Sequence, residues 1–420
     1  MIHEPPSQTR PGRSTGSARA GLLCLLALLL AATLLHPAEA AGTKTKRKPI
    51  KAPRSLTTAD RADPSVVRIP GGYVVLSTGT RVPRATSTNG LRFTGAGTAL
   101  LRKPTWAKPG EMWAADLASY GGRWLLFFSA YVRGIKSSSH CIGVATSTSA
   151  TGTFTPLDER PLICPPGNAV PAAEDQYVDI SLPDPPAPSA TADPTADPTA
   201  TPTADPTTTP TPSATASPTV QAAPNPANSH GAIDPSFTVI DGRPYLLYKT
   251  DGKPSSLRVL PLTPDGRHAA AKSWQLLRSG GVVENPAMIK RGRYWYLFTS
   301  EGDYSRCSYR TVWRRATSPL ASWQRAMPHV LLSNSQQRLC GPGGADVVLN
   351  GKRTLLYFHS WTCGGTRRAC GAPLHAYAGH DAARRPVRAL YGLRLAFTKR
   401  GFPRIDRWLT VNGLKKTAGS

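Results

Sequence analysis

The stretch "AIDPSFTVIDGRPYLLYKT", from Ala232 to Thr250, consists of two short apolar segments joined by an Asp-Gly turn. Runs of β-branched and aromatic residues bounded by turn residues are typical of β-strands, and a turn that contains glycine joins two strands into a hairpin. The stretch therefore predicts a β-hairpin. An acidic residue, Asp234, lies close to the start of its first strand.

Four other stretches repeat this pattern. They are "ADPSVVRIPGGYVVLSTG" from Ala62, "AADLASYGGRWLLFFSA" from Ala114, "VENPAMIKRGRYWYLFTS" from Val283 and "GADVVLNGKRTLLYFHS" from Gly344. With the turn glycines as markers, 50 residues separate Gly72 from Gly122 and 50 separate Gly242 from Gly292. Five such copies without a long helix predict an all-β fold, a five-bladed β-propeller.

The interval between the second and third copies is longer because it contains a tract of Pro, Thr, Ala, Ser and Asp at residues 183–228. Such a composition cannot build a core and predicts a disordered, solvated segment. Since the hairpin pattern occurs on both sides of the tract, we expect an insertion between blades of one domain. Two β domains joined by a linker are the alternative.

Residues 1–40 have the features of a secretory signal peptide. Arginines precede an apolar run from Leu22 to Leu35, and Ala38-Glu39-Ala40 supplies a small-x-small cleavage site. The run is shorter than the roughly twenty residues of a membrane span. We expect cleavage after Ala40, secretion, and no stable membrane anchor; an uncleaved anchor is the alternative. The expected domain limits are a basic linker at 41–58, the propeller at 59–408 and a tail at 409–420.

Six cysteines remain after this cleavage. An even number in an exported chain suggests disulfides, and their spacings do not match a zinc framework, so no metal site is expected there. Pairing of sequence neighbours is the simplest arrangement: Cys141–Cys164, Cys307–Cys340 and Cys363–Cys370.

The formal net charge of +26 favours anionic surroundings, such as a cell wall, an acidic polysaccharide or nucleic acid. Export argues against nucleic acid as a partner.

Three carboxylates lie at related positions in the repeats. Asp63, Asp234 and Glu284 each lie eight residues before a turn glycine, at positions 71, 242 and 292. Because the first strand of each blade lines the axis of a propeller, these side chains are expected to share one pocket. The alternative for the Asp-Pro pairs is an ordinary turn or strand start.

Clustered carboxylates suit acid–base chemistry, because mutual repulsion and burial keep one protonated while another stays ionised. Glycoside hydrolysis needs such a pair, and carboxylates on different blades suit the wide separation of an inverting enzyme.

At these residues the sequence resembles glycoside hydrolase family 43, which includes arabinanases, β-xylosidases and α-L-arabinofuranosidases. The segments "ADPSV", "AIDPSF" with "DGRPYLLY", and "VENPAMIKRGRYWYLF" are similar to motifs of that family, and the resemblance covers about residues 59 to 400 apart from the tract. It implies that Asp63 is the general base, that Asp234 orients the proton donor and tunes its pKa, and that Glu284 is the proton donor.

Weaker similarities concern substrate binding. "MWAADL" resembles a Trp-Ala-Pro-Asp motif, which implies Trp113 as a platform for sugar rings and Asp116 as a supporting residue. "YFHSW" resembles a fifth-blade segment that directs a histidine, here His359, into the pocket. A buried Trp and a structural His are the alternatives.

One departure concerns an ion. Arabinanase-like members have Gly-Pro-Gly-His, and that histidine helps to hold an ion, such as calcium, on the propeller axis. This chain has "GPGGAD", with Gly344 in place of the histidine. The departure argues against the axial ion, and no cofactor is expected to be required.

The sequence thus predicts a secreted, monomeric, inverting glycosidase that cleaves arabinose- or xylose-containing polysaccharide of plants or cell walls, such as arabinan or arabinoxylan. One alternative is a catalytically weak propeller that binds polysaccharide or anionic cell wall. A fructan-cleaving propeller of the invertase type is a further alternative. It would need an Asn-Asp-Pro-Asn strand and an Arg-Asp-Pro segment, which "ADPS" and "IDPS" do not supply.

Overall fold

A computed structural model describes residues 52–132, 139–157, 160–164, 231–371 and 385–416. These residues belong to one compact unit, Ile50–Ser420. Within the described ranges the chain forms five antiparallel sheets and one short helix, α1 (Asn334–Gln337). The predicted signal peptide, most of the basic linker and the Pro/Thr-rich tract lie outside the described residues.

Each sheet is one blade, and its strands follow one another in chain order. The strands of blades 1 and 2 are β1 (Ser65–Ile69), β2 (Gly72–Leu76), β3 (Pro83–Ser87), β4 (Thr94–Thr98), β5 (Ala107–Tyr120), β6 (Arg123–Val132), β7 (His140–Ser147) and β8 (Thr155–Pro156). Those of blades 3 and 4 are β9 (Ala232–Ile240), β10 (Arg243–Thr250), β11 (Ser255–Pro261), β12 (Trp274–Ser279), β13 (Val283–Arg291), β14 (Tyr294–Glu301), β15 (Arg310–Ala316) and β16 (His329–Leu332). Blade 5 has β17 (Cys340–Asn350), β18 (Arg353–Thr362), β19 (Val387–Phe397), β20 (Pro403–Thr410) and β21 (Gly413–Lys416).

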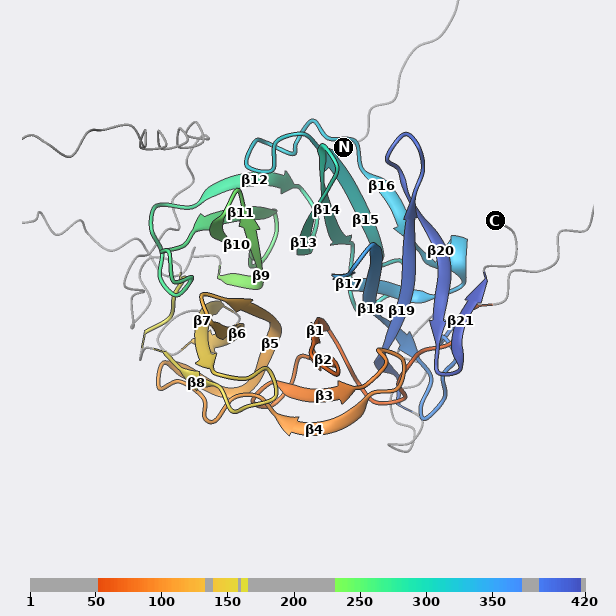
Figure 1. Ribbon diagram of the computed structural model, residues 1–420, viewed down its shortest axis with the longest axis horizontal. Helices are drawn as coiled ribbons and strands as arrows, with labels where there is room; N and C mark the ends of the chain where they lie inside the picture. The colour runs from red at the N-terminus through yellow and green to blue at the C-terminus, as the bar shows by residue number, and fades with distance from the viewer. Residues whose placement is uncertain (1–51, 133–138, 158–159, 165–230, 372–384, 417–420) are drawn as a thin grey trace, which may run out of the picture. The chain divides into compact units, whose positions relative to one another are not determined.

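The five sheets are arranged around one axis, with β1, β5, β9, β13 and β17 innermost (Figure 1). The predicted all-β five-bladed propeller is therefore confirmed. In every blade a two-residue turn joins the first two strands. The residues that pair across these turns are Ile69 and Gly72, Tyr120 and Arg123, Ile240 and Arg243, Arg291 and Tyr294, and Asn350 and Arg353.

The core shows that the two sides of the tract form one domain. Leu125 and Phe127 of blade 2 pack in one buried cluster with Ala232 and Leu246 of blade 3. A shared core of this kind does not form between domains on a flexible linker. The alternative of two β domains joined by a linker is therefore wrong.

The ring closes where the first blade meets the last. The backbone N–H of Leu56 donates to the carbonyl of Leu390 (2.7 Å), and that of Arg61 donates to the carbonyl of Arg388 (2.8 Å). The fold thus begins before residue 59. At the other end β21 continues the fifth sheet past residue 408, so the expected tail supplies its last strand.

All three predicted disulfides are present: Cys141–Cys164, Cys307–Cys340 and Cys363–Cys370. The second one ties the loop after β14 to the start of β17 and so joins blades 4 and 5. Among the described residues, no helix has the length and apolar character needed to cross a membrane.

Candidate active site

Each innermost segment has one residue with a positive φ at the same place. These residues are Asp63 (48°), Ala114 (43°), Asp234 (58°), Asn285 (49°) and Gly344 (58°). In blades 2 to 5 the place coincides with a β-bulge. Left-handed backbone favours Gly, Asn and Asp, because other side chains clash with the following carbonyl. Four of the five blades therefore carry a residue type that the backbone itself prefers.

The five positive-φ positions each lie eight residues before the second residue of the hairpin turn. In blade 4 that position is Asn285, and Glu284 lies one residue earlier. Gly292 is the first residue of its turn, whereas Gly71 and Gly242 are the second in theirs. The prediction that Asp63, Asp234 and Glu284 share one register is therefore wrong for Glu284.

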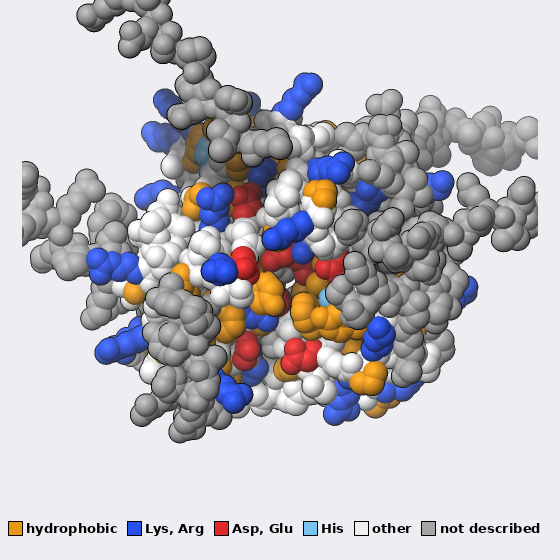
Figure 2. All heavy atoms as spheres, turned by 180° about the vertical axis from the view of Figure 1, so that it is seen from behind, with side chains coloured by type: hydrophobic (Ala, Val, Ile, Leu, Met, Phe, Trp, Pro, Cys, Tyr) orange, Lys and Arg blue, Asp and Glu red, His pale blue; other side chains and the backbone are white. Residues whose placement is uncertain are grey.

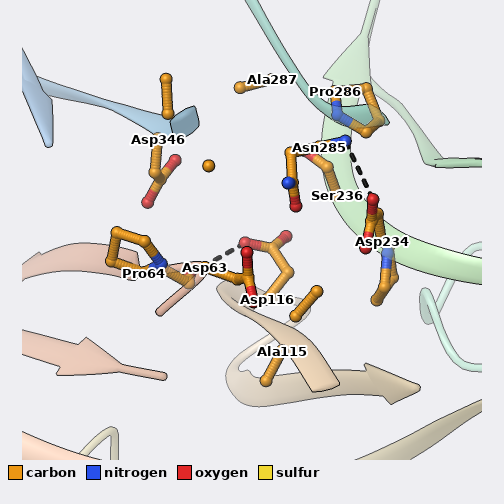
Figure 3. A pocket seen from close by; sticks show the side chains of 15 residues that line it. Asp63, Pro64, Ala115, Asp116, Asp234, Ser236, Asn285, Pro286, Ala287 and Asp346 are labelled. Carbon is orange, nitrogen blue, oxygen red and sulfur yellow. Dashed lines mark hydrogen bonds between the residues drawn. The ribbon is translucent and has the colours of Figure 1, made fainter. Parts of the chain in front are cut away.

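An axial pocket lies between the five innermost strands. Three consecutive residues from each blade line it: 63–65, 114–116, 234–236, 285–287 and 344–346. Figure 3 shows the carboxyl groups of Asp116, Asp234 and Asp346 around this space. Seen from behind, acidic side chains surround a hollow near the centre of the molecule (Figure 2). Of the predicted site residues, Asp63, Asp116 and Asp234 line the pocket.

Asp63 is a carboxylate held in its ionised form. Its Oδ2 accepts a hydrogen bond from Thr78 Oγ1 (2.7 Å), and Arg388 Nη1 lies 3.3 Å from the same oxygen. Burial alone would raise the pKa of Asp63, but the charge of Arg388 and the hydrogen bond from the Thr78 hydroxyl oppose burial, and the pKa is lowered. Asp63 can therefore accept a proton at neutral pH.

Glu284 is buried beside two hydrogen-bond donors. Lys249 Nζ lies 2.7 Å from its Oε2, and Tyr309 Oη donates to its Oε1 (2.6 Å). Burial alone would lower the pKa of Lys249, but the charge of Glu284 and its hydrogen bond outweigh burial and raise the pKa, so the ammonium stays charged. Both oxygens of Glu284 are thus held in fixed directions.

Asp234 carries a proton at neutral pH. Burial and the neighbouring charge of Glu284 raise its pKa to about 8. Its Oδ2 accepts a hydrogen bond from the backbone N–H of Asn285 (3.0 Å), which fixes the carboxyl group next to the segment that carries Glu284. The site therefore combines a carboxylate, Asp63, with a protonated carboxyl, Asp234.

Hydrogen bonds between blades explain why Lys249 is free to bind Glu284. The backbone N–H at three positive-φ positions donates to a side chain in the second strand of the preceding blade or, for Thr78, two residues after that strand. These bonds run from Ala114 to Thr78 Oγ1 (2.9 Å), from Gly344 to Ser300 Oγ (2.8 Å) and from Asp63 to His359 Nδ1 (2.9 Å). In blade 3 the corresponding residue is Lys249, whose ammonium cannot accept a hydrogen bond. Asp234 accepts the Asn285 N–H instead.

Asp116 and Asp346 are half-buried and join blades through hydrogen bonds. Asp116 accepts hydrogen bonds from Ser65 Oγ of blade 1 (2.9 Å) and from the backbone N–H of Phe237 of blade 3 (2.6 Å). Asp346 accepts from the backbone N–H of Val66 (2.5 Å). Burial raises the pKa of Asp116, and burial together with the charge of Asp116 raises that of Asp346 to about 7. The predicted role of Asp116 in substrate binding stays a prediction.

Trp113 is half-buried in an aromatic group next to the pocket. Its ring centre lies 5.6 Å from that of Tyr131 and 4.9 Å from that of His140. His140 Nδ1 in turn lies 2.6 Å from Asp251 Oδ2. The predicted role of Trp113 as a sugar platform stays a prediction.

His359 is fully buried behind Asp63, and burial lowers its pKa to about 3, so the ring is neutral. A Cβ atom on Gly344 would lie 2.6 Å from His359 Nδ1, so His359 fills the space of the side chain that Gly344 lacks. Its Nδ1 already accepts the Asp63 N–H. No group of three metal-binding side chains occurs among the described residues. The expectation that no ion is held at the axis stays a prediction.

Sequence reasoning missed three polar residues that touch the proposed acids: Lys249, Tyr309 and Arg388. Lys249 offered a signal, because it is a cation within the apolar strand segment "YLLYKT". Tyr309 and Arg388 lie in segments without a motif, and only the fold brings them to the site.

Comparisons with known proteins agree with this geometry. The sequence profile of "Glycosyl hydrolases family 43" matches residues 53–164 and 213–373. No curated protein matches the sequence significantly.

Solved structures of the same fold include the alpha-L-arabinanase of Cellvibrio cellulosa in complex with arabinohexaose. It has a TM-score of 0.55 and 18% identity, over 83% of this chain and 96% of that one. A thermostable family-43 glycoside hydrolase has a TM-score of 0.55 and 16% identity, over 86% and 95% of the two chains. The endo-arabinanase of Bacillus licheniformis has a TM-score of 0.52 and 17% identity, over 82% and 97%. At this identity the structures show the fold alone, whereas the profile spans more than half of the sequence. The chain belongs to family 43 of the glycosyl hydrolases.

Proposed function

We propose that the protein is a secreted, inverting glycosidase that cleaves arabinose- or xylose-containing polysaccharide. The observation that carries the proposal is that Asp63 and Asp234 line one pocket in which their surroundings shift their pKa values in opposite directions. The pKa of Asp63 is lowered, whereas that of Asp234 is raised to about 8. Hydrolysis of a glycosidic bond needs a base and an acid at the same pH.

In the proposed reaction Asp63 accepts a proton from a water molecule as the water oxygen attacks the anomeric carbon. Glu284 and Asp234 together hold one proton, and Glu284 donates it to the leaving sugar oxygen while the bond between that oxygen and the anomeric carbon breaks. Lys249 and Tyr309 hold the carboxyl group of Glu284, and Thr78 and Arg388 hold that of Asp63. Asp234 holds this proton before the transfer, because burial and the charge of Glu284 raise its pKa.

The substrate class rests on the similar structures. Two of them are arabinanases, and one was solved with arabinohexaose. Secretion rests on the predicted signal peptide, and the three disulfides fit an oxidising compartment. We further propose that the protein is a monomer and requires no cofactor.

The first test follows the anomeric proton of the released sugar by NMR, with linear arabinan, arabinoxylan and aryl pentosides as substrates. Inversion gives the product of opposite anomeric configuration as the first signal. First appearance of the retained anomer would exclude the proposed mechanism.

The second test separates the two catalytic roles. Glu284→Gln should lower kcat on polysaccharide by about 10²–10⁴-fold, and much less on an aryl pentoside whose leaving group needs no proton. Asp63→Asn should lower both to a similar extent, because water must be activated in either case. Asp241→Asn, in the exposed hairpin turn of blade 3, is the matched control and should leave both rates unchanged. Unchanged turnover in Glu284→Gln would rule out its role. If the protein released no sugar from any substrate but remained bound to polysaccharide, the alternative of a binding propeller would be supported.

A further inference from the structure

The five turns between first and second strands form a ring at the far end of the innermost strands, here called the turn face. It comprises residues 68–73, 119–124, 239–244, 290–295 and 349–354. Six to eight residues separate the positive-φ positions from these turns. At a rise of about 3.3 Å per residue, the turn face lies about 20–25 Å from the proposed acids.

The turn face is strongly basic. Its eight cations are Arg68, Arg123, Arg243, Lys290, Arg291, Arg293, Lys352 and Arg353, and every blade supplies at least one. Arg291 is half-buried and the other seven are exposed. The same five stretches contain one acid, Asp241, which lies 3.6 Å from Lys290. Among the described residues, none of the other seven cations forms an ion pair.

The opposite end of the same strands carries charges of both signs. Asp60 lies near Asp63 and Arg388, and Asp251 lies near Lys249. The turn face differs from that end because it has eight cations and one acid.

The basic turn face continues across the seam between blades 4 and 5 with rigid arginines. Arg315 stacks over the rings of Tyr294 (4.3 Å) and Phe402 (4.8 Å), and its Nη1 donates to the carbonyl of Arg400 (2.5 Å). The guanidinium group of Arg293 also lies over the Tyr294 ring, 4.8 Å from its centre. Stacking fixes the planes of these guanidinium groups, so less entropy is lost when they bind a ligand.

We propose that the turn face is a docking surface for a polysaccharide that carries carboxylate groups, a polyuronate. Guanidinium groups match carboxylates in paired hydrogen bonds, and half-buried aromatic rings pack against the faces of sugar rings. Cations on all five blades call for a repeating anion rather than a small ligand. Docking there leaves the pocket at the opposite end open to a second polymer.

The binding test uses the full mature chain with Glu284→Gln, so that no hydrolysis interferes. Polygalacturonate is the probe, and the dissociation constant is measured by biolayer interferometry at about 50 mM and about 200 mM salt. We expect binding that weakens steeply with salt, because surface charges are screened. Neutral arabinan should not bind to the turn face. Duplex DNA that binds more tightly than polygalacturonate at both salt concentrations would overturn the proposal.

Charge-matched variants locate the contact. Exchange of Arg123, Arg243, Arg293 and Arg353 for Gln should weaken binding by about tenfold or more, since exposed charge contacts contribute about twofold each. The control exchanges four exposed cations outside the turn face, Arg160, Lys272, Arg278 and Arg325, for Gln. It should change the affinity by less than about threefold.

Equal losses in both variants would show attraction by net charge alone and would overturn the proposal. In chains that keep Glu284, either set of substitutions should leave the rate of aryl pentoside hydrolysis equal to that of the parent chain. The outcome of the binding test is therefore independent of whether the proposed glycosidase function is correct.

Discussion

Lys249 occupies the position at which other blades have a hydrogen-bond acceptor. This difference changes the contacts of Asp234 and Glu284. Because an ammonium cannot accept, Asp234 accepts the Asn285 N–H, and Lys249 pairs with Glu284 at 2.7 Å. Both side chains of this pair are about nine-tenths buried. Because residue 249 is a lysine, the carboxyl group of Asp234 binds the backbone of Asn285, and the carboxyl group of Glu284 pairs with the ammonium.

Removal of this cation should impair both folding and catalysis. Lys249→Met leaves Glu284 buried without its partner, and breaking a buried ion pair costs about 3–5 kcal/mol of unfolding free energy. Without the lysine the carboxyl group is also less well placed, so kcat should fall about 100-fold. Urea unfolding and steady-state kinetics measure the two effects. Lys272→Met, at an exposed position, is the control; the same small loss in both variants would contradict the role of Lys249.

The raised pKa of Asp234 makes a prediction about pH. Its folded value of about 8 exceeds the ordinary value of 3.8, so between these values the folded chain binds more protons than the unfolded chain. Stability should therefore fall as the pH rises through this window. The kcat/KM of the wild type should fall above about pH 8, as Asp234 loses its proton.

Asp234→Asn tests both points, since Asn also tolerates the positive φ of this position. Melting temperatures between pH 5 and 8 should depend less on pH in the variant than in the wild type. The decline of kcat/KM above pH 8 should disappear, although the rate itself falls. If the same decline persisted in Asp234→Asn, another group would have to be its cause.

At the scale of the element, the hairpin was predictable but the bulge was not. Alternating apolar residues and turn glycines define the two strands, and both are visible in "AIDPSFTVIDGRPYLLYKT". A bulge adds one residue to one strand without a composition of its own. In blade 4 the glycine is the first residue of the turn and not the second. Counting back from it therefore gave Glu284 the position that Asn285 occupies. Asp-Pro pairs marked the bulge correctly in blades 1 and 3, since Asp tolerates the left-handed backbone.

The bulge of blade 5 depends on a glycine. Gly344 has a φ of 58°, and an added Cβ would lie 2.6 Å from His359 Nδ1 and 3.2 Å from Asp63 Cα. Gly344→Ala should therefore lower the free energy of unfolding by about 2–4 kcal/mol, from backbone strain and overpacking together. Differential scanning calorimetry and urea unfolding measure this loss.

A double-mutant cycle with His359→Ala separates the two causes. Removal of the ring should recover the part of the loss that comes from the clash, but not the part that comes from the positive φ. If the two substitutions were simply additive, His359 would not occupy the space above Gly344.

At the scale of the whole molecule, the sequence predicted the number of blades, the three disulfides and the continuity of the fold across the tract. Each of these depends on repetition or on neighbours in sequence. The contacts of Asp63 with Arg388 and His359 depend instead on ring closure, which brings together residues about 300 positions apart. No local pattern encodes such contacts, so the residues around the proposed base could not be predicted.

The ends of the interval between blades 2 and 3 meet on one strand. Ile163 bridges to Ile142 of β7, and a Cβ on Gly231 would lie 2.5 Å from the backbone N of His140 on the same strand. Replacement of residues 165–230 by about eight Gly/Ser residues should therefore preserve the fold. This replacement halves the loop length about three times, and the smaller entropy cost of closing the shorter loop should add about 2 kcal/mol to the free energy of unfolding.

Chemical unfolding and the rate on a small aryl pentoside test this deletion. The parent chain and the shortened chain should have the same rate, and the shortened chain the higher midpoint. A shortened chain that failed to fold would show that the tract is required for the joining of blades 2 and 3.

The positive φ shared by all five blades also has a consequence for how this protein can change through mutation. Asp63 and Asp234 occupy positions where the backbone accepts Asp and Asn alike, and one nucleotide separates their codons. Loss of the proposed chemistry at either residue therefore need not cost the chain its fold. A lineage of such propellers can lose hydrolysis in one step, keep a folded sugar-facing pocket, and regain hydrolysis by reversing that step.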